Sequence, residues 1–186
     1  MSRPEPIPEP WFSFLKKLDE LATTTVALHC IGGFVVTMLY GLSRTTGDLD
    51  VLEVCPKSAG NAFAKVAMQG GELHKKYKVY LDHVGVAQPP YDYESRLQEM
   101  FFGAFRNLRL MALDPYDLAL TKLERNIERD RSDVRYLART VPFDLEILRE
   151  RYTTELRPYL GHPAREDLTL RFWIEDIEED RASRPA

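Results

Sequence analysis

Apolar and polar positions alternate with two different periods in the first half of the chain. Apolar side chains recur at helical spacing in residues 11–21 and form one stripe: Trp11, Phe14, Leu15, Leu18 and Leu21. Short runs rich in β-branched and apolar residues predict buried strands over residues 23–31, 47–54 and 76–86. The stretches between these runs predict helices over residues 34–42 and 58–69.

The second half of the chain is dominated by helical patterns. Residues 94–106 predict a helix and residues 108–113 a short strand. Asp114 as an N-cap and Pro115 at the first helical position mark the start of a helix over residues 114–128. A second helix is expected from residues 130–132 through residue 139. Two more are expected after residue 141, separated near the sequence GHP at 161–163.

This order of elements predicts an α+β fold, in which a mixed sheet with flanking helices is followed by a C-terminal helical domain. The proline-rich residues 1–10 are expected to form a flexible arm. We expect the α/β domain to cover residues 11–110 and the helical domain residues 111–186.

Composition excludes several classes of protein. The formal net charge of −4 over 186 residues gives no electrostatic case for nucleic-acid binding by the surface as a whole. Cys30 and Cys55 stand alone in apolar runs, which suits neither a disulfide framework nor a metal cluster. The first ten residues lack the apolar core of a signal peptide, and no apolar run reaches the roughly 18–20 residues of a membrane span. We therefore expect a cytoplasmic protein that makes no membrane contact.

Two aspartates one residue apart carry the clearest candidate chemistry. Asp48 and Asp50 project from the same face of a predicted strand, where two like charges repel each other. A divalent cation such as Mg²⁺ or Mn²⁺ relieves that repulsion, and Asp82 on the next predicted strand can supply a third carboxylate. Such a set can hold two metal ions about 3.5–4 Å apart for phosphoryl transfer. The alternatives are a solvated strand edge for the pair and a lysine ion pair for Asp82.

A glycine pair stands between the first predicted strand and the next helix. The missing side chains of Gly32 and Gly33 would let a phosphate approach backbone N–H groups at a helix start. This is not a P-loop, because no Lys-Ser/Thr follows at the required spacing. Arg44, Thr45 and Thr46, just before the aspartates, could also contact phosphate oxygens. Taken alone, a glycine pair is more often a simple turn.

The stretch IGGFVVTMLYGLSRTTGDLDVLEV (residues 31–54) resembles the signature of the DNA polymerase β-like minimal nucleotidyltransferases. The resemblance is closest to the AbiEii-like branch, which includes toxins of toxin–antitoxin systems and many uncharacterised bacterial proteins. The stretch LDPYDLALTKLERNIERDRSDVRYL (residues 113–137) resembles a downstream motif of that branch. Together with the strand that carries Asp82 they span about residues 25–140, and residues 141–186 resemble nothing we can name.

The resemblance implies functions for particular residues. It implies that nucleotide and metal are bound by Gly32, Gly33, Asp48 and Asp50. It also implies that Lys122 contacts the triphosphate, with Asp130 or Asp133 as supporting acidic groups. The alternatives are a solvated lysine paired with nearby acids, and an N-cap role for Asp130. His29 and His83 lack metal-ligand spacing to other His or Cys residues, so we interpret them as packed or supporting side chains.

The activity that the resemblance implies is metal-dependent transfer of a nucleoside monophosphate from a nucleoside triphosphate to an acceptor hydroxyl. The acceptor stays open: tRNA, with a cognate antitoxin as partner, or a protein or small molecule. A basic surface for RNA would come from Arg125, Arg129, Arg131, Arg135 and Arg139, although neighbouring acids offset it. The alternative of another class is a non-catalytic module that binds a nucleotide or a partner protein.

Overall fold

The computed structural model describes residues 7–85 and 87–184, so most of the arm predicted at 1–10 lies outside the described residues. The chain divides into two compact units. The first unit comprises residues 1–86 and 97–113, and the second comprises residues 87–96 and 114–186. The boundary falls between Leu113 and Asp114, and residues 87–96 belong to the second unit, which the predicted division near residue 110 did not include.

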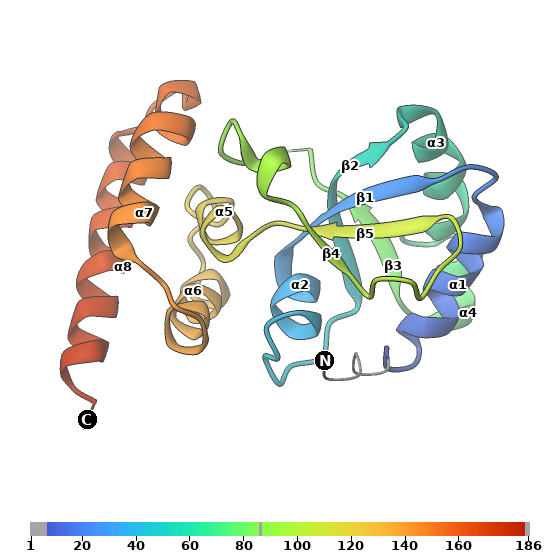
Figure 1. Ribbon diagram of the computed structural model, residues 1–186, viewed down its shortest axis with the longest axis horizontal. Coiled ribbons are helices and arrows are strands. Elements are labelled where there is room, and N and C mark those ends of the chain that lie inside the picture. Colours follow the sequence, from blue (N-terminus) through green and yellow to red (C-terminus); the bar gives the residue numbers. More distant parts are fainter. Residues whose placement is uncertain (1–6, 86, 185–186) are drawn as a thin grey trace. The chain divides into compact units, whose positions relative to one another are not determined.

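A five-stranded mixed sheet forms the centre of the first unit (Figure 1). Its strands are β1 (Val26–Ile31), β2 (Asp48–Cys55), β3 (Tyr80–His83), β4 (Gln98–Met100) and β5 (Leu108–Ala112). Their order across the sheet is β3-β2-β1-β5-β4. Strand β1 is antiparallel to β2 and parallel to β5, β2 is parallel to β3, and β4 is antiparallel to β5. The mixed sheet with flanking helices confirms the predicted α+β class.

Four helices pack on this sheet: α1 (Trp11–Leu21), α2 (Gly32–Met38), α3 (Lys57–Ala67) and α4 (Glu72–Tyr77). The predicted stripe of α1 is buried from Trp11 to Leu18, whereas Leu21 is exposed. The ring of Trp11 meets the rings of Phe14 and Phe34 edge-on, with centroid distances of 5.7 and 4.7 Å. These aromatic contacts join α1 to α2 within the core of the first unit.

The second unit is helical. Its helices are α5 (Pro115–Leu120), α6 (Glu128–Thr140), α7 (Leu145–Arg151) and α8 (Ala164–Ala182), with 3₁₀ turns at Tyr93–Arg96 and Arg157–Tyr159 and a π-helical turn at Tyr152–Leu156. Helices α7 and α8 agree with the two helices predicted on either side of residues 161–163. Among the helices that the structure describes, none is long and apolar enough to cross a membrane.

Two predicted elements are wrong because left-handed backbone interrupts them. The helix predicted over residues 94–106 is replaced by a 3₁₀ turn and the short edge strand β4, after which Phe101 (φ 54°) and Gly103 (φ 76°) turn the chain. The strand predicted over residues 76–86 begins only at Tyr80. Residues 72–77 form α4 instead, and Lys78 (φ 64°) ends that helix in the left-handed conformation.

The long helix predicted over residues 114–128 is also shorter than expected. Asp114 caps it as predicted, with its side chain accepting from the backbone N–H groups of Tyr116 and Asp117. The helix nevertheless ends at Leu120, turns follow, and Asn126 (φ 44°) adopts a left-handed conformation before α6 begins. Lys122 therefore lies on a turn and not on a helix.

A network of ion pairs joins residues 87–96 to the helices of the second unit. Arg96 donates two hydrogen bonds to Asp117 at 2.8 and 3.2 Å and binds Glu155 at 2.6 Å. Arg151 contacts Asp114 at 2.7 Å and Asp117 at 3.0 Å. Burial raises the pKa of Asp117 above its ordinary value even though both guanidinium groups oppose that shift. Fully buried Asp117 thus depends on the two arginines for its partners.

Asp19 of α1 anchors the start of β5. Its carboxylate accepts hydrogen bonds from the backbone N–H groups of Arg106, Asn107 and Leu108 at 3.1, 2.6 and 2.8 Å. Partial burial raises the pKa of Asp19, but these three donors and the charge of Arg109 outweigh it and hold the pKa below its ordinary value. The ionised carboxylate therefore stabilises the first unit.

We predict that Asp19→Ala lowers the free energy of unfolding by about 1–3 kcal/mol at pH 7, because three backbone donors lose their acceptor. The depressed pKa means that this contribution is present above the unfolded-state pKa of about 3.9 and is lost as the pH falls through the folded-state value. Urea denaturation at pH 7 and in acid should therefore show the two proteins converging in acid. Glu20→Ala, an exposed neighbour, serves as the control, and an equal effect of both substitutions would contradict the anchor.

Candidate functional site

The register of the sheet brings the three predicted carboxylates together. In the parallel pair of β2 and β3, Asp50 lies opposite Asp82 and Asp48 lies opposite Tyr80. Residues in register on adjacent strands share a face, and Asp48 and Asp50 share theirs by alternation. Asp48 and Asp50 are half-buried, whereas Asp82 is exposed near the end of β3. All three side chains therefore stand on one face of neighbouring strands.

The hydroxyl group of Tyr80 experiences the combined charge of this acidic face. Burial raises the pKa of Tyr80, and the negative charges of Asp48, Asp82 and Asp50 raise it further. Tyr80 was not identified from the sequence, where it reads as an ordinary strand residue. The carboxylates of Asp48, Asp82 and Asp50 therefore all lie close enough to Tyr80 to affect its hydroxyl group.

Gly32 provides the space in which the Asp50 side chain lies. The antiparallel register of β1 and β2 pairs Asp50 with Ile31, the residue immediately before Gly32. A Cβ atom placed on Gly32 would lie 1.9 Å from Oδ2 of Asp50, and the φ angle of Gly32 is +73°. Both facts require glycine at this position. The bare backbone that we expected to accommodate a phosphate is thus approached by a carboxylate of the chain itself.

The residues that precede β2 have different environments. The hydroxyl group of Thr46 donates to Oδ1 of Asp48 at 2.8 Å and is 3.1 Å from the carbonyl oxygen of the same residue. Arg44 is half-buried, and its carbonyl oxygen accepts a hydrogen bond from Thr37 at 3.4 Å. Thr45 is exposed. Thr46 therefore orients Asp48, and this was not expected from the sequence.

The glycine pair and the histidines complete the description of this face. Gly33 is buried in the first turn of α2, which has only seven residues. His29 is buried on β1, as expected of a packed residue, whereas His83 is exposed on β3. Burial raises the pKa of the Cys30 thiol, to which the nearby charge of Asp50 contributes, so this thiol is not a reactive nucleophile.

In the second unit, Lys122 and the two predicted aspartates form one buried cluster. The ammonium group of Lys122 is 2.9 Å from Asp133 and 3.5 Å from Asp130, and only 4% of Lys122 is exposed. Arg125 donates two hydrogen bonds to Asp130, at 2.8 and 2.6 Å. Burial raises the pKa of Asp130, but Arg125 and Lys122 together hold it below its ordinary value. Two cations and two carboxylates leave the cluster with no formal net charge.

Asp130 has a second role, which the sequence had raised as an alternative. It is the third residue of α6, and its Oδ2 atom accepts from the backbone N–H of Ile127 at 3.2 Å. The carboxylate thus satisfies a donor at the helix start while it binds two cations. The solvated lysine considered for position 122 is excluded by burial, whereas its pairing with acids is what the structure shows.

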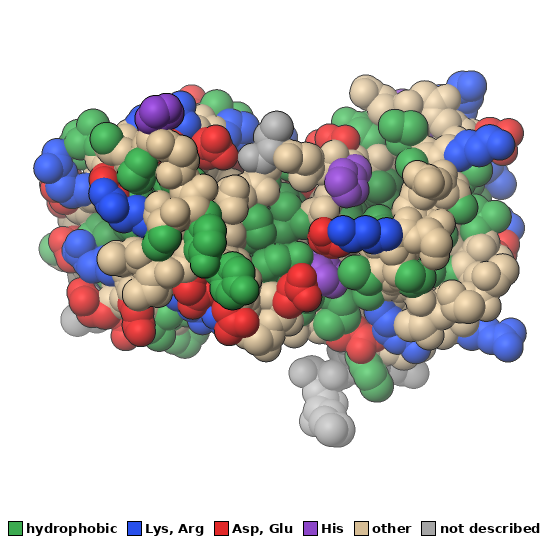
Figure 2. All heavy atoms as spheres, turned by 90° about the horizontal axis from the view of Figure 1, so that it is seen from above, with side chains coloured by type: hydrophobic (Ala, Val, Ile, Leu, Met, Phe, Trp, Pro, Cys, Tyr) green, Lys and Arg blue, Asp and Glu red, His purple; other side chains and the backbone are tan. Residues whose placement is uncertain are grey.

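Arg125, Arg131, Arg135 and Arg139, four of the five arginines considered as an RNA surface, bind acidic or carbonyl groups of the second unit. Arg135 pairs with Asp176 at 2.7 Å, Arg139 pairs with Asp180, and Arg131 donates to the carbonyl oxygen of Asn126 at 2.9 Å. Arg139 lowers the pKa of Asp180 to about 2. On the face drawn in Figure 2, basic and acidic side chains are interspersed. The acids that neutralise these arginines come mainly from α8, forty-one residues away, so the local charge pattern did not reveal them.

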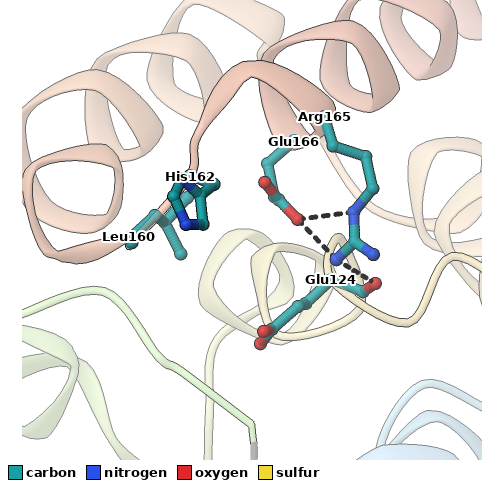
Figure 3. Close-up of a pocket in the computed structure, with 6 residues that line it drawn as sticks. Glu124, Leu160, His162, Arg165 and Glu166 are labelled. Carbon is teal, nitrogen blue, oxygen red and sulfur yellow. Dashed lines mark hydrogen bonds and ion pairs between the residues drawn. The ribbon is translucent and has the colours of Figure 1, made fainter.

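A shallow pocket of about 370 Å³ lies within the second unit. Its lining includes Glu124, Leu160, His162, Arg165 and Glu166. Figure 3 shows the guanidinium group of Arg165 between Glu166, which it binds at 2.6 Å, and the backbone carbonyl of Glu124, which it binds at 2.9 Å. The bond to Glu124 joins the start of α8 to the turn after α5, whereas the bond to Glu166 lies within α8.

A divalent metal is the cofactor that the resemblance implies, and the first unit fits it in part. The three carboxylates are hard oxygen ligands on adjacent strands, and their mutual repulsion favours a cation. Among the described residues, however, no three His, Cys, Asp or Glu side chains converge as a preformed metal site. The ligand chemistry and the strand register fit a metal ion. The carboxylates of Asp48, Asp50 and Asp82 would have to move closer together when the metal binds.

Comparison with models of known protein families assigns the chain to one of them. The chain belongs to the family described as "Nucleotidyltransferase of unknown function" (DUF6036), whose model matches residues 11–180. Comparisons with curated proteins and with solved structures find no match. Membership covers both units, including the C-terminal helices that resembled nothing in the sequence alone.

We predict that Gly32→Ala lowers the free energy of unfolding by about 2–4 kcal/mol, because the new methyl group meets Asp50 and the backbone is left-handed. Gly47→Ala is the matched control, since no atom lies within 4 Å of a Cβ built there. Chemical denaturation of both variants measures the difference. Equal stability of the two variants would show that Asp50 does not lie against Gly32.

Proposed function

We propose that this protein transfers a nucleoside monophosphate from a nucleoside triphosphate to an acceptor hydroxyl, using the acidic face of β2 and β3. The observation that carries the proposal is the register that sets Asp82 beside Asp50, with Asp50 seated against Gly32. Membership of a family described as nucleotidyltransferases supports the same reaction class.

Asp48, Asp50 and Asp82 would hold Mg²⁺ or Mn²⁺ in this proposal. When bound, the metal would neutralise charge on the triphosphate and on the departing pyrophosphate. The chain itself contributes orientation. Thr46 holds Asp48, the Gly32 backbone leaves room for Asp50, and β3 presents Asp82 to solvent.

The reaction forms one bond and breaks one. The acceptor oxygen bonds to the α-phosphorus, the bond between the α-phosphorus and the bridging oxygen breaks, and pyrophosphate leaves with the electron pair. Asp82, the exposed member of the three, is the carboxylate suited to take the proton of the acceptor hydroxyl.

We assign nucleotide contacts to further residues as part of the same proposal. In the first unit these are Gly32, Gly33, Arg44, Thr45 and Thr46, near the acidic face. For the second unit taken by itself, the resemblance implies a triphosphate contact for Lys122, with Asp130 and Asp133 as supporting acidic groups. The ammonium group of Lys122 is already compensated by two carboxylates, so a triphosphate would compete with Asp133 for it.

The identity of the acceptor molecule is the most specific part of the proposal. A relationship to the AbiEii-like branch, with tRNA as acceptor and an antitoxin protein as partner, rests on the resemblance of residues 31–54 and 113–137. The ion pairs with Asp176 and Asp180 compensate Arg135 and Arg139, two of the four arginines of α6. An RNA acceptor would therefore bind weakly, and its binding would fade with added salt.

The test follows label from nucleoside triphosphates into acceptors. The protein is incubated with each of the four triphosphates, labelled at the α- or γ-phosphate, with Mg²⁺ or chelator. Acceptors are total tRNA, a protein extract and a small-molecule extract. We expect transfer of the α-label only, dependent on metal, and abolished by Asp50→Asn with the melting temperature unchanged, because removing one of two repelling carboxylates leaves the metal-free fold intact.

Glu53→Gln is the control, since Glu53 is an acid on the same strand and forms an ion pair with exposed Lys57, at 3.8 Å. Its transfer activity should equal that of the unmodified protein. Transfer of the γ-label would replace the proposal with phosphotransfer. Nucleotide binding without transfer to any acceptor would contradict catalysis and favour a nucleotide-binding module.

A further inference from the structure

One face of α8 binds the turn that carries Lys122. Arg165, Thr169 and Trp173 are spaced four residues apart and therefore lie in one row along the helix. Arg165 donates to the carbonyl oxygen of Glu124 at 2.9 Å. The indole N–H of Trp173 donates to Oδ1 of Asn126 at 3.1 Å, and Nδ2 of Asn126 donates to the hydroxyl group of Thr169 at 3.4 Å. Three successive turns of α8 thus hold residues 124–126.

Asn126 is the centre of these contacts. Its backbone is left-handed (φ 44°), a conformation that asparagine tolerates better than most residues with a side chain. Its N–H donates to the carbonyl oxygen of Lys122 at 2.9 Å, and its own carbonyl accepts from Arg131 at 2.9 Å. The side-chain amide is held at both ends by α8. The backbone of Lys122 is thereby closed into a turn whose far end is fixed to another helix.

The buried cluster depends on that turn. Lys122 and Arg125 reach Asp130 and Asp133 from positions within it, and each pairing falls between 2.6 and 3.5 Å. Thr169 and Trp173 are themselves buried, so their polar groups need these partners. The hydrogen bond from the buried indole N–H of Trp173 fixes the position of the left-handed turn at Asn126.

We propose that Asn126 is a positioning residue for Lys122 and that α8 holds Asn126 in place through Thr169 and Trp173. The inference rests on the proposed function for its effect on nucleotide binding, but the positioning itself can be measured without nucleotide. The proposal gives α8 a function, which is to hold the turn that carries Lys122. This helix lies in residues 141–186, whose sequence resembled nothing we could name. Nucleotide affinity would then depend on a hydrogen bond made by residue 173.

The test uses two variants that preserve the backbone. Asn126→Gly keeps the left-handed corner without strain and removes the side-chain hydrogen bonds to Thr169, Trp173 and Arg131. Trp173→Phe keeps an aromatic ring and removes the indole donor together with part of the buried ring system. Arg181→Gln is the control, because Arg181 lies on the same helix but joins α8 to the carbonyl oxygen of Phe143 and not to the turn at residues 122–126.

The first readout is the rate at which acetic anhydride modifies each lysine, followed by mass spectrometry. We expect acylation of Lys122 to rise about tenfold in both corner variants, the equivalent of about 1.4 kcal/mol of lost positioning. Exposed Lys57 should be unchanged, and so should every lysine of Arg181→Gln. An unchanged rate at Lys122, or an equal rise at all lysines, would overturn the proposal.

The second readout is the dissociation constant for the triphosphate with Mg²⁺. We expect it to rise about tenfold in Asn126→Gly and Trp173→Phe and not in Arg181→Gln. Exposed Lys122 without any change in affinity would overturn the link to nucleotide binding. If the unmodified protein binds no nucleotide, the proposed function fails, while the acylation rates still decide whether α8 positions Lys122.

Discussion

The approach of the Asp50 carboxylate to the bare α-carbon of Gly32 is the constraint on which the candidate site depends. It couples a glycine at the end of β1 to an aspartate on β2, because any side chain at position 32 would occupy the space of the carboxylate. The parallel register of β2 and β3 then adds Asp82 to the same face. Burial and the charges of Asp48, Asp82 and Asp50 all raise the pKa of Tyr80 on the same face. The site keeps this geometry only while residue 32 has no side chain.

The main constraint on the second unit is the burial of charged side chains. Asp117 is fully buried between Arg96 and Arg151, and Lys122 is buried between Asp130 and Asp133. Removing one partner of such a pair leaves an uncompensated buried charge, which costs about 3–5 kcal/mol. The conformation of the turn after α5 is therefore tied to electrostatics as well as to the hydrogen bonds of α8.

Much of the first unit was predictable because its signals are local. The stripe of α1 and the apolar runs of β1 and β2 follow directly from periodicity, and alternation along β2 placed Asp48 and Asp50 on one face. Strand β4 was missed because three residues at a sheet edge carry too little pattern. The end of α5 at Leu120 was missed because Asn126 is held by Thr169 and Trp173, more than forty residues away. The role of Gly32 toward Asp50 required the strand register, which no local pattern contains.

Electron paramagnetic resonance of Mn²⁺ tests the central claim directly, since it counts metal bound by the acidic face. With a nucleoside triphosphate present, the account predicts that Asp48→Asn and Asp50→Asn each weaken Mn²⁺ binding by at least about tenfold, since even partners outside the ligand shell cost that much. Glu53→Gln should bind as the unmodified protein does. Equal Mn²⁺ affinity in all four proteins would contradict the assignment of this face as the metal-binding centre.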